Sequence, residues 1–208
     1  MENSFAKASG TSICLGSLIS IVTMALHPTG GSIEHIVRIQ NVLIFSHTLA
    51  IACLPLMCFG ALGLSATLRT DSRISLLAFI VFGFGLVAGM IAAAINGLIL
   101  PKFLSDSLTK PFDDSQLKTV LRYGHHINTA MTNVFIFATS VSIAIWCILI
   151  IRLSQLPGWV GYWGLLLLGF ELVCLVIKVN FTDLYGFRIF VFGLATWLIA
   201  VGIQLRSK

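Results

Sequence analysis

The chain has 208 residues, of which 57% are hydrophobic and 10% are charged, and its formal net charge is +5. A soluble domain averages about 25% charged residues, so this composition, with a mean hydropathy of +0.98, excludes a folded domain with a water-exposed surface. The basic residues are scattered and are not interleaved with aromatic residues as a cluster, which excludes nucleic acid as a partner. Membrane lipid is the expected solvent, and one bundle of helices is the expected domain.

Six apolar runs are long enough to cross a bilayer, which requires about 20 residues. They predict an all-α, polytopic membrane protein with six transmembrane helices at about 11–27, 39–67, 74–100, 124–151, 159–179 and 184–205. We expect a single transmembrane domain over residues 1–208. A polar segment at about 101–123 is expected at the surface, with a helix that begins after Pro111.

The links between the helices predict the orientation. The two tight links carry three arginines, and Trp159, Tyr162 and Trp163 follow the second of them. Because short inner loops are enriched in basic residues and aromatic side chains gather at the interfaces, we expect both termini on the inner side. The five cysteines all lie in apolar runs without a CxxC pair, and we interpret them as small buried hydrophobic residues.

The first helix carries its small and hydroxyl residues on one face. This stripe consists of Ser12, Gly16, Ser20, Thr23 and His27, which recur every three or four residues. Side chains at this spacing share one helix face and let membrane helices approach closely. We therefore expect the stripe to pack against other helices and His27 to face the bundle.

Charged residues and histidines from five or six of the helices gather at one end. With both termini inside, the outer half holds His27, His47, Asn96, His125, His126, Asn133, Lys178, Asp183 and Arg188, and Glu171 lies nearer the middle. A polar side chain inside a membrane is costly unless it has a partner. This convergence predicts a polar pocket in the outer leaflet, for which Glu171, Lys178, Arg188, Asn96, Asn133 and Asp183 are the candidate ligand-binding residues.

Four histidines are candidate metal ligands, namely His27, His47, His125 and His126. Imidazoles with a carboxylate or water suit zinc, copper or non-haem iron, although the spacing matches no metal motif. The structural alternative is that His27 caps a helix, His47 is a hydrogen-bonded bundle residue and the other two are solvated. A further alternative is a haem b between His47 and His126.

The charged residues of the last two helices suggest an ion pair. A carboxylate inside the membrane needs a partner, and Arg188, which follows a tight turn, is the expected partner of Glu171. The long side chain of Lys178 can reach outward to the interface. Such a pair either locks the two helices together, anchors an anionic head group or titrates a proton.

The first 65 residues carry a resemblance. LHPTG at residues 26–30 and SHTLA at residues 46–50 resemble small uncharacterised bacterial six-helix inner-membrane proteins, in which an LHPTG-like end of the first helix precedes a second helix with an embedded histidine. The resemblance implies a bacterial inner (plasma) membrane and no particular activity.

Three functions remain as expectations. The first is a pocket that binds a metal ion, a small molecule or a lipid, with or without catalysis. The second is a small proton- or ion-coupled transporter, which three plus three helices and a break at Pro55 would allow, although transporter sites lie nearer the midplane. The third is a structural or assembly subunit, in a homo-oligomer or a membrane complex, whose small-residue stripes pack on partner helices.

Overall fold

The computed structural model of the protein describes residues 2–69, 73–109 and 113–208, and these residues form helices without any strand. The helices are α1 (Glu2–Leu26), α2 (Ile33–Arg38), α3 (Gln40–Arg69), α4 (Ile74–Ala94), η1 (Ile95–Ile99), α5 (Leu100–Thr109), α6 (Asp114–Leu153), α7 (Gly158–Val176) and α8 (Leu184–Arg206). Within the described residues, 6 helices are long and apolar enough to cross a membrane. The prediction of an all-α, six-helix membrane bundle is confirmed.

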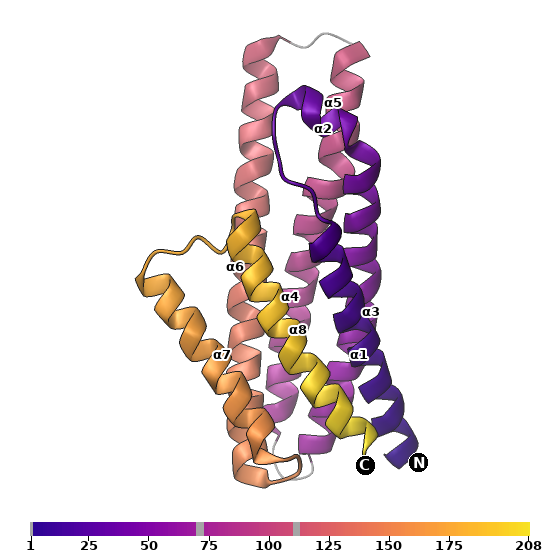
Figure 1. Ribbon diagram of the computed structural model, residues 1–208, viewed down its shortest axis with the longest axis vertical. Helices are drawn as coiled ribbons and strands as arrows, with labels where there is room; N and C mark the ends of the chain where they lie inside the picture. The colour runs from indigo at the N-terminus through magenta and orange to yellow at the C-terminus, as the bar shows by residue number, and fades with distance from the viewer. Residues whose placement is uncertain (1, 70–72, 110–112) are drawn as a thin grey trace.

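The six long helices are arranged as a ring. In the order of their contacts, α1 packs between α8 and α3, α4 packs between α3 and α6, and α7 connects α6 back to α8. Both termini lie at the same end of the bundle, and α7 leans away from the other helices (Figure 1). The polar end of α1 therefore lies between α3 and α8.

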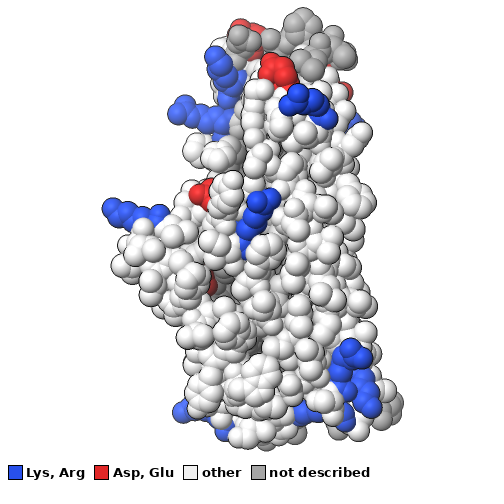
Figure 2. Space-filling view, viewed as in Figure 1, with Lys and Arg blue, Asp and Glu red and all other residues white. Residues whose placement is uncertain are grey.

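The outer surface of the ring is apolar. The side chains of Phe84, Phe137 and Val176 are 69%, 72% and 80% exposed. Most of the face in Figure 2 is uncharged, with basic side chains at both ends and a few at mid-height. Exposed apolar surface of this extent marks a membrane-facing surface rather than a water-facing one. The chain is therefore a multi-pass membrane protein.

Helices α1 and α3 approach each other closely along the stripe expected from the sequence. Ser12 Oγ donates a hydrogen bond of 3.0 Å to the carbonyl oxygen of Leu56. A Cβ atom at Gly60 would overlap the side chain of Ile13, and one at Gly63 would overlap Ser9. Glycine at these two positions is what allows the backbones to meet.

Replacing Gly60 with alanine should therefore loosen this contact. We expect Gly60→Ala to lower the free energy of unfolding by about 1–3 kcal/mol, the usual range for overpacking, although alanine raises helix propensity by about 1 kcal/mol. The unfolding midpoint in detergent measures the effect. Gly169→Ala is the matched control, because a Cβ there meets nothing within 4 Å; equal losses in both variants would contradict the prediction.

The third span changes its helix type near the polar end of the bundle. Residues Ile95–Ile99 form a π-helical turn, after which α5 continues the same span. Such π turns are frequent at functional sites. The polar segment at 101–123 is thus helical where it is described: α5 prolongs the third span and the beginning of α6 prolongs the fourth, and both project beyond the other helices (Figure 1). Pro111 lies outside the described residues.

Candidate functional site

A cavity of about 270 Å³ lies inside the ring, in the half of the bundle away from the termini. Helices α1, α3, α4, α6 and α8, the π turn and the segments at 28–30 and 182–183 all contribute to its wall. Most of the wall is apolar and includes Met24, Leu54, Met57, Phe135, Phe187 and Val191. A largely apolar cavity with a few polar groups is the usual form of a small-molecule site.

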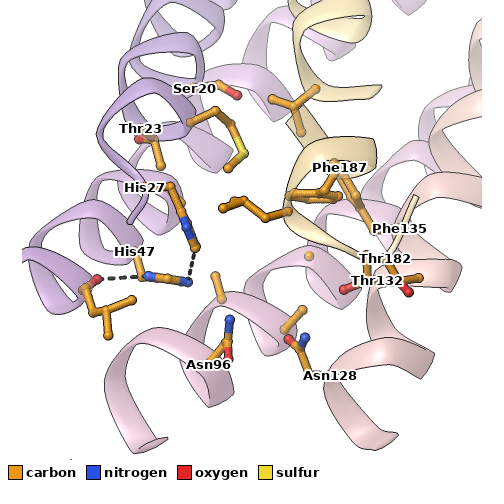
Figure 3. A pocket seen from close by; sticks show the side chains of 18 of the residues that line it. Ser20, Thr23, His27, His47, Asn96, Asn128, Thr132, Phe135, Thr182 and Phe187 are labelled. Atoms are coloured by element: carbon orange, nitrogen blue, oxygen red, sulfur yellow. Dashed lines mark hydrogen bonds between the residues drawn. The ribbon is translucent and has the colours of Figure 1, made fainter. Parts of the chain in front are cut away.

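The polar groups of the cavity come from several parts of the chain. Four of the residues expected from the sequence line it, namely His27, His47, Asn96 and Asp183. Thr23, Asn128 and Thr132 line it as well, and Figure 3 shows the Asn96 and Asn128 side chains pointing towards the space below the histidines. Polar side chains thus reach the cavity from α1, α3, α6 and the π turn, whereas α4 and α8 contribute only small or apolar residues.

The two histidines form a pair. His27 follows the last residue of α1, and His47 lies in the second turn of α3 with only 5% of its surface exposed. Their Nε2 atoms are 3.3 Å apart and their ring centroids 4.7 Å apart. Figure 3 shows the two rings meeting edge to edge at the wall of the cavity.

Backbone carbonyl groups fix the proton on each ring. Nδ1 of His27 donates to the carbonyl oxygen of Pro28 at 2.9 Å, and Nδ1 of His47 donates to that of Leu43 at 2.8 Å. Ser46 Oγ lies 3.4 Å from the latter nitrogen, but it donates to the same Leu43 oxygen. A neutral imidazole with its proton on Nδ1 has a lone pair on Nε2, so both facing nitrogens are acceptors.

The charge state of His27 follows from its surroundings. Burial lowers the pKa of the His27 ring below its usual value, the hydrogen bond to Pro28 opposes this shift, and the positive charge of Arg188 adds to it. An unperturbed histidine titrates near about 6.5. His27 is therefore neutral at pH 7 and keeps its lone pair.

The π turn positions His47. Gly97 lies in that turn, and a Cβ atom there would overlap the Cγ, Cβ and Nδ1 atoms of the His47 side chain. The imidazole therefore packs directly on the backbone of the third span. The same turn carries Asn96, whose side chain reaches the cavity one residue before the point of contact.

Arg188 holds the end of α1 that carries His27. Its Nε donates to the Met24 carbonyl oxygen at 3.1 Å, and its Nη2 donates to the His27 carbonyl oxygen at 2.6 Å. The last carbonyl groups of a helix have no partner within the helix and carry partial negative charge. One guanidinium group therefore caps α1 and ties it to α8.

The expected ion pair between Glu171 and Arg188 is wrong. Ser140 Oγ lies 3.0 and 2.9 Å from the two carboxyl oxygens of Glu171 and donates to them, whereas Arg188 binds the carbonyl groups of α1. Glu171 lines a small cleft between α6, α7 and α8, apart from the cavity. Two residues on adjacent helices face different neighbours here, since α7 leans away from the bundle (Figure 1).

Removing the charge of Glu171 should therefore cost little. We expect Glu171→Gln to change the free energy of unfolding by less than about 1 kcal/mol, because an amide still accepts a hydrogen bond from Ser140 and a neutral group is cheaper in a membrane. A double-mutant cycle with Arg188→Gln, measured by unfolding in detergent, should give a coupling energy near zero. A coupling above about 1.5 kcal/mol would restore the ion pair.

The structure keeps the remaining expected residues away from the cavity. His125 and His126 are exposed, with ring centroids 5.9 Å apart, and Asn133 and Lys178 are exposed as well. Asn133 follows Thr132 by one residue, which turns its side chain about 100° away from the cavity face of α6. The expected metal site of His27, His47 and either His125 or His126, with a carboxylate such as Glu171 or Asp183, is not formed. Within the described part of the chain no three His, Cys, Asp or Glu side chains are grouped to hold a metal ion.

Two features of the site had only weak signals in the sequence. Asn128 and Thr132 belong to a polar stripe on α6 spaced by four residues, which marks the cavity face when the register is chosen correctly. Gly97 resembles any other small residue in the sequence, and its contact with His47 depends on the π turn.

No protein-family model, no curated protein and no solved structure matches this chain.

Proposed function

We propose that this membrane protein binds a small, largely apolar molecule with a polar group in the cavity between α1, α3, α4, α6 and α8. One observation carries the proposal: the amide groups of Asn96 and Asn128 face this cavity without a hydrogen-bond partner among the described residues. The apolar wall would hold the body of the ligand, and the unpartnered groups would hold its polar end.

Thr23 belongs to the cavity wall, but its hydroxyl does not face the open space. Thr23 is 3% exposed, and its Oγ1 atom is buried without a hydrogen-bond partner among the described residues. A ligand in the cavity would therefore contact the two amide groups and not this hydroxyl.

The amide groups of Asn96 and Asn128 are the unpartnered polar groups. Both line the cavity, and neither forms a hydrogen bond with another residue in the described part of the chain. An amide offers two donors and one acceptor oxygen, and each points from its own helix towards the same space (Figure 3). The two amides favour a ligand whose polar group both donates and accepts hydrogen bonds, such as an alcohol, a phenol or an amide.

Filling the cavity tests the proposal. Ala93 of α4 lines the cavity, whereas Val87 of the same helix is 50% exposed on the lipid-facing side. We would extract wild-type protein, Ala93→Phe and the control Val87→Phe, each purified in mild detergent, and compare the released small molecules by mass spectrometry. A compound near equimolar amount in the wild type and in Val87→Phe, but lost from Ala93→Phe, supports the proposal. Identical extracts from all three would refute it.

The cellular location is part of the same proposal. The arginines of the tight links support placing both termini inside, and the resemblance of the first 65 residues supports the inner membrane of a bacterium. The cavity then opens in the outer half of the bilayer, where an apolar molecule dissolved in lipid has access. Two separate fusions at the C-terminus test this orientation. Fluorescence of a fluorescent-protein fusion, together with inactivity of a phosphatase fusion, would support a C-terminus on the inner side. An active phosphatase fusion would place the C-terminus on the outer side.

A further inference from the structure

The facing nitrogens of the histidine pair present a problem that the protein alone does not solve. Both Nδ1 atoms donate to carbonyl groups, so both Nε2 atoms, 3.3 Å apart, present lone pairs to each other. Two acceptors at this distance cannot hydrogen-bond to one another. The arrangement is stable when a positive centre lies between them.

The separation of the nitrogens fits a metal ion. Imidazole nitrogens bind zinc at about 2.0–2.1 Å, so two of them at a tetrahedral angle are about 3.3–3.4 Å apart. The observed distance between the Nε2 atoms is 3.3 Å. The pair therefore already has the spacing of two ligands on one metal ion.

The second nitrogen of each ring also has the environment of a metal ligand. A histidine that binds a metal through one nitrogen usually donates the other N–H to a carbonyl or carboxylate group, which fixes the ring and strengthens the ligand. Pro28 and Leu43 accept these hydrogen bonds at 2.9 and 2.8 Å. Gly97 packs against the His47 ring from the side and further restricts its orientation.

We propose that His27 and His47 bind one transition-metal ion, Cu⁺ or Zn²⁺, between their Nε2 atoms. The proposal goes beyond the binding of an apolar molecule and does not depend on it. The described residues provide no third His, Cys, Asp or Glu ligand in a group, so further coordination positions face the cavity. Met24 and Met57 line the same cavity, and thioether groups favour Cu⁺.

The surrounding charges favour an ion of low charge. Arg188 donates to the His27 carbonyl oxygen, and its positive charge opposes a second cation nearby. Asp183, which lines the cavity and accepts a hydrogen bond from the Gly186 N–H, is the carboxylate on the same wall. A monovalent ion meets less repulsion from Arg188 than a divalent one, which places Cu⁺ before Zn²⁺.

Metal loading of the full-length protein tests the inference. Wild-type protein in detergent is incubated with Zn²⁺, or with Cu⁺ under reducing conditions, desalted, and analysed for metal per chain. We expect one ion per chain, with at least tenfold weaker binding in His27→Gln and in His47→Gln. The matched control is the double variant His125→Gln/His126→Gln, which removes two exposed histidines and should bind as the wild type does.

A spectroscopic measurement on the wild type tests the inference without any variant that could misfold. Protein loaded with Cu²⁺ should show, in pulsed electron paramagnetic resonance, nitrogen couplings from two imidazole rings. Failure of the wild type to retain any of these ions overturns the inference and leaves a shared proton between the rings. Retention in both glutamine variants, or loss in the His125/His126 variant, overturns it as well. Ala93→Phe, which is expected to lose the apolar ligand, should still bind the metal ion, because the metal site does not depend on that ligand.

Discussion

Gly97→Ala should displace the His47 ring and abolish binding in the cavity. The added Cβ would overlap the His47 side chain at its Cγ, Cβ and Nδ1 atoms. These atoms lie near the base of the side chain, so they cannot move aside as the end of a flexible side chain could. We expect an overpacking cost of about 1–3 kcal/mol in stability, and the loss of both the copurifying molecule and the bound metal ion. Mass spectrometry of the extract and metal analysis measure the two losses.

Gly83→Ala is the matched control for this variant. Gly83 lies in α4, in the same span, and a Cβ there meets nothing within 4 Å. The control should bind as the wild type does, and its stability should stay unchanged or rise by up to about 1 kcal/mol through helix propensity. Normal binding by Gly97→Ala would mean that the His47 ring is not held as described.

Arg188→Gln should destabilise the bundle and release the end of α1. The guanidinium group donates to the carbonyl oxygens of Met24 and His27 at 3.1 and 2.6 Å, and hydrogen bonds from a charged donor contribute about 1.5–3 kcal/mol each. We expect a loss of about 2–4 kcal/mol in the free energy of unfolding, because the shorter amide replaces at most one of these bonds. Binding in the cavity should weaken with it, since His27 follows directly on α1.

Exposed Arg152 offers the comparison. It lies in the last turn of α6, at the end of the bundle that carries the termini, and Arg152→Gln should change stability by less than about 0.5 kcal/mol. Unfolding in detergent and hydrogen exchange at residues 24–28 distinguish the two variants. Equal stability of Arg188→Gln and Arg152→Gln, with unchanged protection of the α1 end, would show that the cap does not matter.

The length and apolarity of each run were sufficient to predict the six spans, because both are local properties, but they did not give every helix end: the first helix was expected at about 11–27, and α1 is Glu2–Leu26. The sequence places α8 at 184–205, and the structure places it at Leu184–Arg206. Side-chain register on α6 was harder to choose. Asn128, Thr132 and Asn133 are all polar, and only the packing of α6 on α4 decides that the first two face the cavity.

The partners of charged residues could not be predicted in the same way. Glu171 and Arg188 are the natural ion pair in a sequence, whereas Arg188 binds two backbone oxygens of α1, more than 160 residues earlier in the chain. Carbonyl groups at a helix end are present in every helix and leave no mark in the sequence. Their availability to Arg188 depends on the crossing of α1 and α8.

The histidine pair lies between these cases. Convergence of polar residues on one end of the bundle predicted that His27 and His47 share a pocket, and both line the cavity. His125 and His126 were expected in the same pocket, but they are exposed on the surface of α6. The position of a residue along its helix predicts its depth in the membrane, but it does not predict whether the side chain faces the cavity or the lipid.

An experimental density map of the full chain tests most directly whether the cavity beside His27 and His47 is a ligand site. Protein purified from membranes in mild detergent, without added ligand, is the sample. We predict non-protein density that contacts the amide groups of Asn96 and Asn128, inside the cavity of about 270 Å³. A map in which these two groups bond to one another across a closed cavity, with no density between them, would contradict this prediction.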